Sequence, residues 1–508
     1  MNKIFLILAV LLFSLPIIVS AATINAASCS QSSVQAAVNS ASDGDTVVIP
    51  AGTCTWGASL NLDLSAPKAL TIIGAGIGST IINDYGFDVT GGNGKPWRIS
   101  GMTMTGSAGV SVDGFSKNWR IDHIYFDHIT GKASASGRVI FVQPTGSGTP
   151  DFTAGVIDHC TFDTPSSTSI HIRDFWASGG NSVWNRPLGL GTSDAVFIED
   201  CKFINPGNAV TDCEGGSYVF RYNQVTNGFV SSHDAIVTNL RACRKWEVYN
   251  NLFINTPGQT CTDIRLRGGT GVIFSNRIQG QPDCGNAIQL QHYRCDQTGG
   301  DPWTTLCSST SGKACLGSAN TYPRTCSSDA DCNGISGACI NIDNPNDPTG
   351  HPCRDQIGWD GSKVMVSRPS LLWDNTQDGV YFDPDTPRCS SYIAKGRDFC
   401  TGASSMPVSC NGVATSYVPF TYPHPLRTDC VKYPSLCDSG STPPPPPPPP
   451  TVPGDLNNDG KVDITDLVIV ATNFGRTSGF DVRANVVSSI PEVIDISDLS
   501  FVARRFTG

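Results

Sequence analysis

Short segments in which apolar and polar residues alternate recur along the chain and share a common phrase. The clearest copies are Phe-Arg-Tyr-Asn at 220–223, Val-Tyr-Asn-Asn at 248–251 and Ile-Phe-Ser-Asn at 273–276, and each is followed two residues later by an apolar side chain. The equivalent asparagines, Asn223, Asn251 and Asn276, are 28 and 25 residues apart. Repeat periods of roughly 20–50 residues are typical of solenoids and other stacked arrays.

The same phrase returns before and after this stretch. Weaker copies lie at 99–102, 121–124, 157–160, 198–201 and 372–375. Alternation over a few positions, with Gly, Asn or Asp nearby, is the pattern of short strands. No convincing helix separates the copies, so βαβ units are not expected, and the pattern predicts an all-β parallel solenoid. The asparagines, with Asn375 as a late member, would stack about 4.8 Å apart and form a structural ladder of amide hydrogen bonds.

Both ends of the predicted solenoid carry segments of different character. Residues 30–40 have helical spacing, with Val34 and Val38 on one face and serines that can cap the helix. A helix placed before the first strand, at 46–50, would cover the open end of the solenoid, where backbone groups would otherwise face solvent. At the other end, the aromatic and proline residues of 419–426 are expected to pack against the last coil.

Changes in composition divide the chain into domains. A cysteine-rich stretch at 295–353 interrupts the strand rhythm and lacks the apolar content for a core of its own, so we expect a disulfide-held insertion within a solenoid domain at 23–440. Residues 441–453 contain eight consecutive prolines, which adopt an extended polyproline II spacer. This linker separates the solenoid from a C-terminal module at 454–508.

The composition also indicates where the protein resides. Residues 1–22 combine Lys3, an apolar run and small residues, which predicts a secretory signal peptide, with a membrane anchor as the alternative. No second long apolar segment follows, so we expect no membrane span in the mature protein. The 20 cysteines fit a secreted, extracellular protein, free or attached to a cell surface or larger assembly. Cys160 and Cys201 share the ladder column and are a candidate disulfide.

The net charge limits the classes of ligand. At −10, it argues against non-specific nucleic-acid binding, because that binding depends on neutralising phosphates. It leaves an acidic polysaccharide open, since a local basic groove can exist on an acidic protein.

The start of the C-terminal module has the spacing of a twelve-residue calcium loop. Gly460 stands at the sharp turn in position 6. Calcium takes several oxygen ligands, and this spacing wraps them around one point. The predicted ligands are Asp455, Asn457, Asp459, the Lys461 carbonyl, Asp463 and Asp466.

Two parts of the chain resemble known families. The runs at 44–53 and 71–76 resemble the early coils of pectate-lyase-like, right-handed parallel β-helix proteins, and the resemblance covers roughly residues 27–435. The duplicated C-terminal module resembles a type I dockerin, a small α-helical, EF-hand-like domain, with Ile464-Thr465 and Ile496-Ser497 at the positions that face a cohesin in that family. The dockerin resemblance implies a cohesin-bearing scaffold as partner. The second loop departs from the pattern, with Val487, Ser489 and Pro491 at its first ligand positions, which puts calcium and cohesin binding there in doubt.

Candidate chemistry lies on the outward positions of neighbouring coils. In the run at 263–268, alternation sends Arg265 and Arg267 outward, and we align Arg241 of the previous coil with Arg267. The next coil presents Gln289 and Gln291. It is followed by His292 and Arg294, and the preceding coils carry Asp212, Glu214, His233 and Asp234.

Lyases of the resembling superfamily cleave uronate chains by β-elimination, in which a cation neutralises the sugar carboxylate and a base removes the adjacent proton. Arg267 or Arg241 would act as neutraliser or base, and His233 is the easier base near neutral pH. Calcium in the groove of the solenoid is an alternative neutraliser. The candidates are therefore Arg267, Arg241, His233 and Asp212 for catalysis, and Arg265, Gln289, Gln291 and Arg294 for binding the polysaccharide.

Two other functions remain open from the sequence. A glycoside hydrolase on the same fold needs two carboxylates, for which Asp212, Glu214 and Asp234 are the candidates. A non-catalytic, carbohydrate-binding scaffold would use the same charges as a surface ion-pair ladder.

Overall fold

The structure is a computed structural model of the chain. It describes residues 21–292 apart from 67, 93, 115, 130–137, 144–151, 174–183, 185, 235–240, 259–261 and 283–284. It further describes 312–315, 327–332, 339–342 and 355–437 apart from 361–365, 388–389 and 391–392. In the C-terminal module it describes 462, 464–476 and 496–503.

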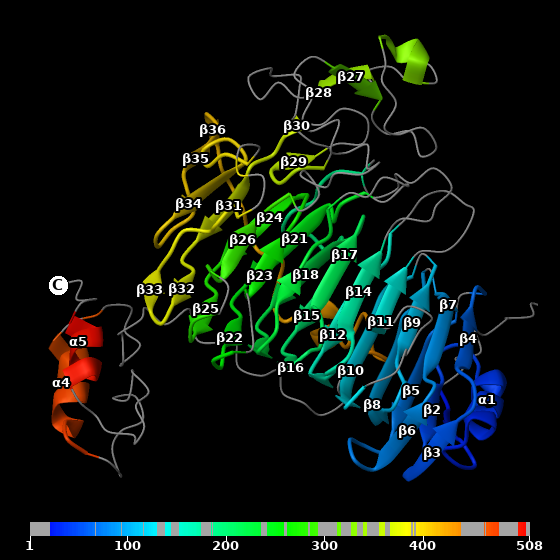
Figure 1. Cartoon of the computed structure of the whole chain (residues 1–508). Coiled ribbons are helices and arrows are strands. Elements are labelled where there is room, and N and C mark those ends of the chain that lie inside the picture. The colour runs from blue at the N-terminus through cyan, green and yellow to red at the C-terminus, as the bar shows by residue number, and fades with distance from the viewer. Residues whose placement is uncertain are drawn as a thin grey trace, which may run out of the picture.

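The chain winds through three strands per coil, and each strand pairs in parallel with its counterpart in the next coil (Figure 1). This confirms the predicted parallel β-helix. One set of counterparts forms a nine-stranded sheet. Its strands are β4 (Leu60–Leu64), β7 (Phe87–Gly91), β9 (Val110–Asp113), β11 (Arg138–Gln143), β14 (Thr168–Arg173), β17 (Thr211–Glu214), β20 (Val230–Ser231), β23 (Ile264–Leu266) and β26 (Ile288–Leu290).

The other two sets merge into a 21-stranded sheet because β8 and β10 run through both of them. We name the first set series 1. It contains β2 (Thr46–Ile49), β5 (Leu70–Gly74), β8 (Trp97–Thr105), β10 (Lys117–Asp127), β12 (Ala154–Asp158), β15 (Val196–Glu199), β18 (Ser217–Arg221), β21 (Lys245–Tyr249), β24 (Thr270–Phe274), β31 (Ser370–Trp373) and β34 (Phe399–Gly402). Series 2 holds the ends of β8 and β10 with β3 (Gly52–Trp56), β6 (Thr80–Asp84), β13 (Thr161–Asp163), β16 (Lys202–Ile204), β19 (Gln224–Thr226), β22 (Leu252–Ile254), β25 (Arg277–Gln279) and β32 (Thr376–Gln377).

The recurring phrase marks the bend between series 1 and series 2. The residue before each ladder asparagine has a positive φ, between 51° and 58°, at Tyr222, Asn250, Ser275 and Asp374. This left-handed conformation turns the chain sharply. The asparagines then bond in a column: Nδ2 of Asn251 donates to Oδ1 of Asn276 over 2.9 Å, and Nδ2 of Asn276 donates to Oδ1 of Asn375 over 2.9 Å. The predicted asparagine ladder is confirmed.

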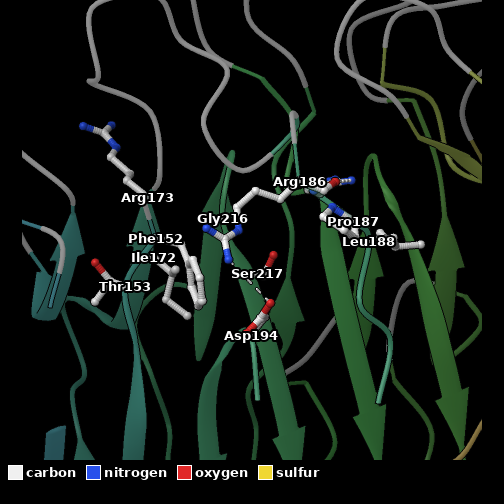
Figure 2. A pocket seen from close by; sticks show the side chains of 11 residues that line it. Phe152, Thr153, Ile172, Arg173, Arg186, Pro187, Leu188, Asp194, Gly216 and Ser217 are labelled. Atoms are coloured by element: carbon white, nitrogen blue, oxygen red, sulfur yellow. Dashed lines mark hydrogen bonds and ion pairs between the residues drawn. The ribbon is translucent and has the colours of Figure 1, made fainter. Parts of the chain in front are cut away.

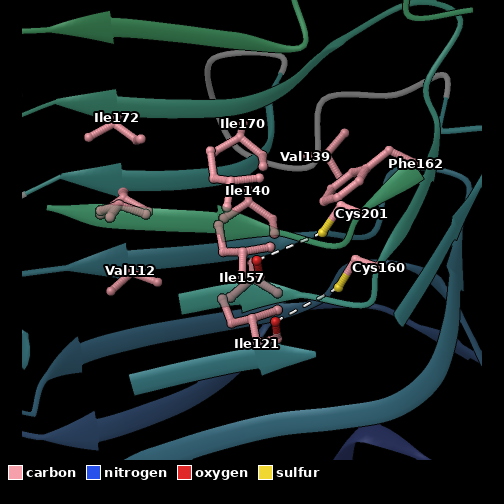
Figure 3. Close-up of a cluster of buried hydrophobic side chains, with 14 of the residues drawn as sticks. Val112, Ile121, Val139, Ile140, Ile157, Cys160, Phe162, Ile170, Ile172 and Cys201 are labelled. Carbon is pink, nitrogen blue, oxygen red and sulfur yellow. Dashed lines mark hydrogen bonds between the residues drawn. The ribbon is translucent and has the colours of Figure 1, made fainter. Parts of the chain in front are cut away.

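The core fills the inside of the coils with stacked apolar side chains. Phe162 stacks on Phe126 and Phe203 at ring-centroid distances of 4.7 and 4.8 Å. Cys160 and Cys201 lie in the same core beside Ile157 (Figure 3), but both are free thiols, so the predicted disulfide between them is wrong. Their Sγ atoms instead face the carbonyl oxygens of Ile121 and Ile157, at 3.8 and 3.7 Å, because equivalent core side chains stack along the solenoid axis and point the thiols the same way.

The N-terminal end is capped as predicted. Helix α1 (Gln31–Ser40) begins at Ser30, whose side chain accepts a hydrogen bond from the Ser33 N–H, and it buries Val34, Ala37 and Val38. Strand β1 (Thr23–Asn25) pairs in parallel with β2.

The C-terminal segment of the solenoid domain, residues 417–437, differs from the prediction. It does not close the last coil but runs back over the outer side of series 1, where it contains α3 (Pro425–Thr428). Phe420 packs on Phe197 at 5.3 Å between ring centroids, and the Leu436 carbonyl accepts a hydrogen bond from Arg120. Buried arginines on series 1 hold the backbone of this segment, which explains why it extends so far from the last coil.

The remaining described elements are small. Antiparallel pairs join β27 (Gly312–Cys315) to β28 (Cys339–Ile342), β29 (Trp359–Asp360) to β30 (Val366–Ser367), β32 to β33 (Val380–Tyr381), and β35 (Ser409–Cys410) to β36 (Val413–Ala414), and Asp329–Cys332 form a 3-10 helix. In the C-terminal module α4 (Ile464–Asn473) packs against α5 (Ile496–Ala503) around Val462, Val470 and Val502. No helix among the described residues has both the length and the apolar character to cross a membrane.

Candidate active site

The nine-stranded sheet carries two outward columns of polar side chains, which the strand register defines. Asp212 pairs with His171 of the preceding coil, and Glu214 pairs with Arg173. Two coils on, Arg265 pairs with Ser231 and with Gln289. Continuing the register places His233 beside Arg267 on consecutive coils, just past the ends of β20 and β23. This register places arginines, histidines and carboxylates on neighbouring strands of one sheet, and Figure 1 shows these strands side by side.

One side of the cluster is built around a buried histidine, His171. Arg138 Nε donates to His171 Nδ1 over 2.6 Å. Because an arginine only donates, this nitrogen accepts, so His171 carries its proton on Nε2. Nε2 lies 3.4 Å from Oε2 of Glu214. Burial lowers the pKa of His171, which keeps the ring neutral.

Glu214 is held in its charged form. Its Oε2 accepts from Arg173 Nε over 2.5 Å, and Oε1 lies 4.0 Å from Nε2 of His233. Burial disfavours the carboxylate, but the hydrogen bond from His171 and the charges around it, including Arg173, outweigh this cost. They hold the pKa of Glu214 well below its usual range. Glu214 is therefore an acceptor and an anion at neutral pH.

His233 has the opposite tautomer to His171. Its Nδ1 lies 2.8 Å from the backbone carbonyl oxygen of Asp234. A carbonyl only accepts, so in the neutral ring Nδ1 carries the proton and Nε2 carries the lone pair. The side chain is 13% exposed, which allows a ligand on this face to approach it. This is the state that a general base requires.

Arg267 lies next to His233 in the register and is anchored through its backbone and its Nε. Its N–H donates to Ser232 Oγ over 3.0 Å, and Nε donates to the Ser232 carbonyl over 2.8 Å. Its terminal nitrogens lie 3.7 Å from Asp212 Oδ1 and 3.9 Å from Asp234 Oδ1, which is longer than a hydrogen bond. The hydrogen bond from Nε therefore orients the guanidinium. The terminal nitrogens are too far from these two carboxylates for hydrogen bonds to them.

No described strand pairing aligns Arg241 with Arg267, so the stacking of these two residues stays a prediction. Continuing the register of β20, in which Ser231 pairs with Arg265, puts His233 opposite Arg267. Arg241 is 2% exposed and makes a two-pronged ion pair with Asp355, whose Oδ1 lies 2.6 Å from Nη2. Its guanidinium also lies 4.0 Å from the ring centre of Trp184. Its contacts join the coil to the chain that follows the insertion.

The predicted binding residues fall at different depths. The Arg265 guanidinium lies 4.2 Å over the Phe229 ring, on the outward column as predicted. Gln289 and Gln291 hold the predicted register but are buried, at 8% and 3% exposure, since a further segment around Asp385 bonds to β26. Arg294 lies outside the described residues.

The covering of β26 is a backbone contact. The Leu290 N–H donates to the Asp385 carbonyl over 2.8 Å, and Gln289 forms a parallel bridge with Asp385. The segment around Asp385 therefore covers β26, the last strand of the nine-stranded sheet. The polar face that ligands can reach lies nearer to β14, β17, β20 and β23.

Three members of the cluster were missed from the sequence: Arg138, His171 and Arg173. The run Ser-Ile-His-Ile-Arg at 169–173 alternates as clearly as the run at 263–267, and this pattern was the available signal. Arg138 had no such signal, because its position relative to His171 depends on the register of β11 against β14.

The fit of a metal ion to this cluster can be tested on its donors. One ligand atom from each of His171, Asp212 and Glu214 lies within 4.8 Å of the others. Calcium takes six to eight oxygen ligands, whereas this set includes an imidazole whose Nδ1 is bonded to Arg138 and whose Nε2 carries a proton. Arg173 already neutralises Glu214. These three donors therefore do not fit calcium.

The predicted calcium loop of the C-terminal module falls almost entirely outside the described residues. Of its ligands, Asp455, Asn457, Asp459, Lys461 and Asp463 are not described. Asp466 is described, and it is buried in the first turn of α4.

Two adjacent hollows lie at the edge where the nine-stranded sheet passes into series 1, and the first of them borders the polar cluster at Arg173. The first has a cavity volume of about 20 Å³ and lies over the short turn after β17, between Phe152 and Arg186. Figure 2 shows Arg173 at its rim with the guanidinium turned away from the hollow. The second, of about 370 Å³, shares Phe152, Arg186 and Asp194 with the first and reaches the C-terminal segment.

Comparisons with known proteins add little to this geometry. No protein-family model matches the chain, and no curated protein matches it in sequence. An alginate lyase from Paenibacillus sp. str. FPU-7 is 14% identical, with a TM-score of 0.31, and the match covers 53% of this chain and 90% of that one.

A mutant of the PL6 family alginate lyase AlyGC is 13% identical, with a TM-score of 0.31 and coverage of 84% of this chain and 59% of that one. AlyGC itself is 14% identical with a TM-score of 0.26, and the match covers 80% of this chain and 58% of that one. This chain thus spans less than two thirds of AlyGC. Scores this low do not identify a shared function, so the site rests on the geometry described above.

Proposed function

We propose that the protein is a polysaccharide lyase that cleaves a uronate-containing glycan by β-elimination on the nine-stranded sheet. The observation that carries this proposal is that His233 and Arg267 approach the same carboxylate oxygen: Asp234 Oδ1 lies 3.5 Å from His233 Nδ1 and 3.9 Å from Arg267 Nη1. A lone pair on Nε2 of His233 and a guanidinium beside it are the two groups that the reaction needs: a base and a neutraliser of the sugar carboxylate.

In the proposed reaction, Arg267 binds the carboxylate of the sugar and stabilises the negative charge that develops next to it. His233 Nε2 takes the proton from C5, the carbon that bears the carboxylate. The electron pair of that C–H bond forms the C4–C5 double bond, the C4–O bond breaks, and the glycosidic oxygen leaves with a proton from water. The products are an unsaturated uronate and a shortened chain.

The other cluster members orient these two groups. Asp212 and Asp234 lie near the tip of Arg267 and limit its rotation. The anionic Glu214 faces Nε2 of His233 and would stabilise the imidazolium formed after proton transfer. Arg265 and Arg173 add positive charge for neighbouring sugar carboxylates. Arg241 is buried in its ion pair with Asp355. In this proposal it has a structural role and does not touch the substrate.

The state of Glu214 favours a lyase over a glycoside hydrolase. A hydrolase needs one carboxylic acid with a raised pKa to protonate the leaving oxygen. The pKa of Glu214 is instead held well below its usual range by its neighbours despite its burial. This carboxylate cannot serve as the acid near neutral pH.

The reaction class can be tested by incubating the full chain with alginate, polygalacturonate and a neutral glucan. Ultraviolet absorbance and reducing ends are followed together. We expect ultraviolet absorbance with an acidic polymer, because the product double bond is conjugated with the carboxylate. Reducing ends without absorbance would establish a hydrolase, and neither signal on any polymer would favour a non-catalytic binding protein.

We also propose that the protein is secreted and carries a dockerin-like, calcium-binding module for attachment to a cohesin-bearing scaffold. Disulfides within the described residues, among them Cys29–Cys54 and Cys213–Cys243, support an oxidising compartment. The loop spacing at 455–466 and the packed pair α4 and α5 support the module.

The calcium proposal has a separate test. Chelation by EDTA should loosen α4 and α5, measured as faster amide hydrogen exchange of 464–473 and 496–503, and leave the solenoid unchanged. Equal exchange with and without EDTA would contradict calcium binding by this loop.

A further inference from the structure

The second hollow lies away from the polar cluster, on the flank of series 1. Its walls come from the start of β10, from the chain before β15 and from the C-terminal segment. It has a cavity volume of about 370 Å³, which is enough for a sugar unit, whereas the first hollow admits little more than one water.

The charges that line this hollow are mainly positive. Lys117, Arg186 and Lys432 line it, and Asp194 is the acidic side chain among its lining residues. Asp194 Oδ2 lies 3.8 Å from Arg186 Nη2. Burial lowers the pKa of His424, also in the lining, to about 4, so it is uncharged near neutrality. The hollow therefore carries net positive charge on a chain whose overall charge is −10.

Aromatic rings support these cations. Lys117 Nζ lies 4.3 Å and the Arg186 guanidinium 4.1 Å from the ring centre of Phe152, so the two cations share one ring. Lys432 Nζ lies 5.0 Å from the ring centre of Tyr433. Such contacts hold flexible cationic side chains in place. Tyr433 is partly exposed, and its ring offers a surface on which a sugar can pack.

The hollow is placed within reach of a polymer held at the active site. The first hollow runs from Arg173, which binds Glu214, over Gly216 and Ser217 to Arg186. The second continues from Arg186 to Lys117 and Lys432. Arg186 packs on Phe152 and narrows the first hollow. An extended polysaccharide chain would therefore cross the surface above Arg186 and would not pass through the first hollow.

We propose that the second hollow binds a carboxylated sugar of the polysaccharide chain, several units away from the bond that is cleaved. This inference rests on the proposed function for the position of the cleaved bond. The ligand class follows from the positive charge of the hollow, its volume and the aromatic rings that contact its cations. We expect an acidic sugar unit, bound through Lys117, Arg186 and Lys432.

The experiment compares a Lys117→Ala/Lys432→Ala double variant of the full chain with a matched control, Lys95→Ala/Lys202→Ala. The control removes the same charge, and neither of its residues lines the hollow. We expect the KM for long alginate or polygalacturonate to rise about five- to tenfold in the hollow variant, the usual range for two exposed ion pairs. We expect an unchanged kcat, and unchanged kinetics on a uronate trisaccharide that is too short to reach the hollow.

Binding is measured in parallel by affinity electrophoresis in gels that contain the same acidic polymer or a neutral glucan. Weaker retardation of the hollow variant by the acidic polymer alone supports the inference, even if no polymer is cleaved and the proposed reaction fails. Equal retardation and equal KM for the two double variants would overturn the inference, and cleavage with ultraviolet absorbance would still support the lyase. Circular dichroism and the Tm verify that both variants are folded.

Discussion

The outer face of series 1 and the outer face of the nine-stranded sheet carry the same kinds of side chain in different surroundings. On series 1, Arg120 donates to both oxygens of Asp158 over 2.9 and 2.8 Å and to the Leu436 carbonyl over 2.5 Å. On the nine-stranded sheet, the tip of Arg267 lies 3.7 and 3.9 Å from its carboxylates. The first face is sealed by residues 417–437, and the second is not covered by this segment.

The difference follows from the cost of burying charge. A buried ion pair must have nearly all of its hydrogen bonds satisfied, or the loss of hydration outweighs the attraction. The series 1 face meets this condition through the C-terminal segment: Arg221 donates to Glu199 and to the Phe420 and Thr421 carbonyls, and Arg427 binds Glu199 and Asp200. On the other face the side chains of Arg267 and Asp212 are 13% and 20% exposed, so a ligand can reach them. Exposure therefore separates the two faces better than the length of the ion pairs, because the candidate site also contains the tight pair Arg173–Glu214.

The largest expected effect is on turnover. His233→Ala should lower kcat about 10²–10⁴-fold, because the base is removed, while the Tm changes little since the side chain is partly exposed. His128→Ala is the matched control, because this histidine is 69% exposed and lies outside the site. The measurement is the rate of ultraviolet absorbance increase. Turnover of His233→Ala equal to that of the control would remove His233 from the reaction.

The next effect is on stability and concerns the sealed face. Arg120→Ala should cost about 3–5 kcal/mol of unfolding free energy, because it leaves Asp158 buried beside an empty space. Arg267→Ala on the other face should cost less, because Arg267 and its neighbour Asp212 are 13% and 20% exposed whereas Arg120 and Asp158 are fully buried. Urea unfolding midpoints of the two variants, with Arg277→Ala as a partly exposed ion-pair control, measure the difference. Equal losses of unfolding free energy for Arg120→Ala and Arg267→Ala would contradict the predicted difference between the two faces.

Acid should weaken the sealed face first. Burial lowers the pKa of His424 to about 4, below its usual value of about 6.5. A lowered histidine pKa contributes stability above the unfolded pKa, and this stability is lost as the pH falls from about 6.5 through about 4. His424→Asn keeps a side-chain acceptor for the Leu426 N–H at the start of α3. The variant should therefore lose less stability than the natural chain between pH 7.5 and 4.5, and parallel curves would contradict this.

An effect of opposite sign is expected beside the nine-stranded sheet. Asp263, just before β23, is buried, and this burial raises its pKa to about 7. Its stabilising contribution is complete below about pH 3.9 and is lost as the pH rises through about 7. Asp263→Asn keeps an oxygen acceptor for Asn255 Nδ2. It should raise the Tm at pH 8 and change it little at pH 4; an equal shift at both pH values would exclude titration of Asp263 as the cause.

The sequence was sufficient to predict the repeating coils, because an asparagine ends each of the phrases at 220–223, 248–251, 273–276 and 372–375. It also identified the outward residues Arg265 and Arg267, since alternation within one strand is local. It did not place Arg241, because the register of a residue outside the paired strands cannot be counted from the sequence. The sealing of series 1 was hidden for a similar reason: Arg120 and Leu436 are 316 residues apart.

The asparagine ladder has a consequence for how the chain can be lengthened. Asn251 and Asn276 are separated by 25 residues, and Asn276 and Asn375 by 99, yet each pair makes the same 2.9 Å amide hydrogen bond. Each rung of the ladder thus fixes its neighbour without regard to the amount of chain between them. Because the entropy cost of closing a loop grows only slowly with its length, we expect that the insertion at 295–353 can be exchanged for a shorter or longer one while the coils on either side keep their stacking.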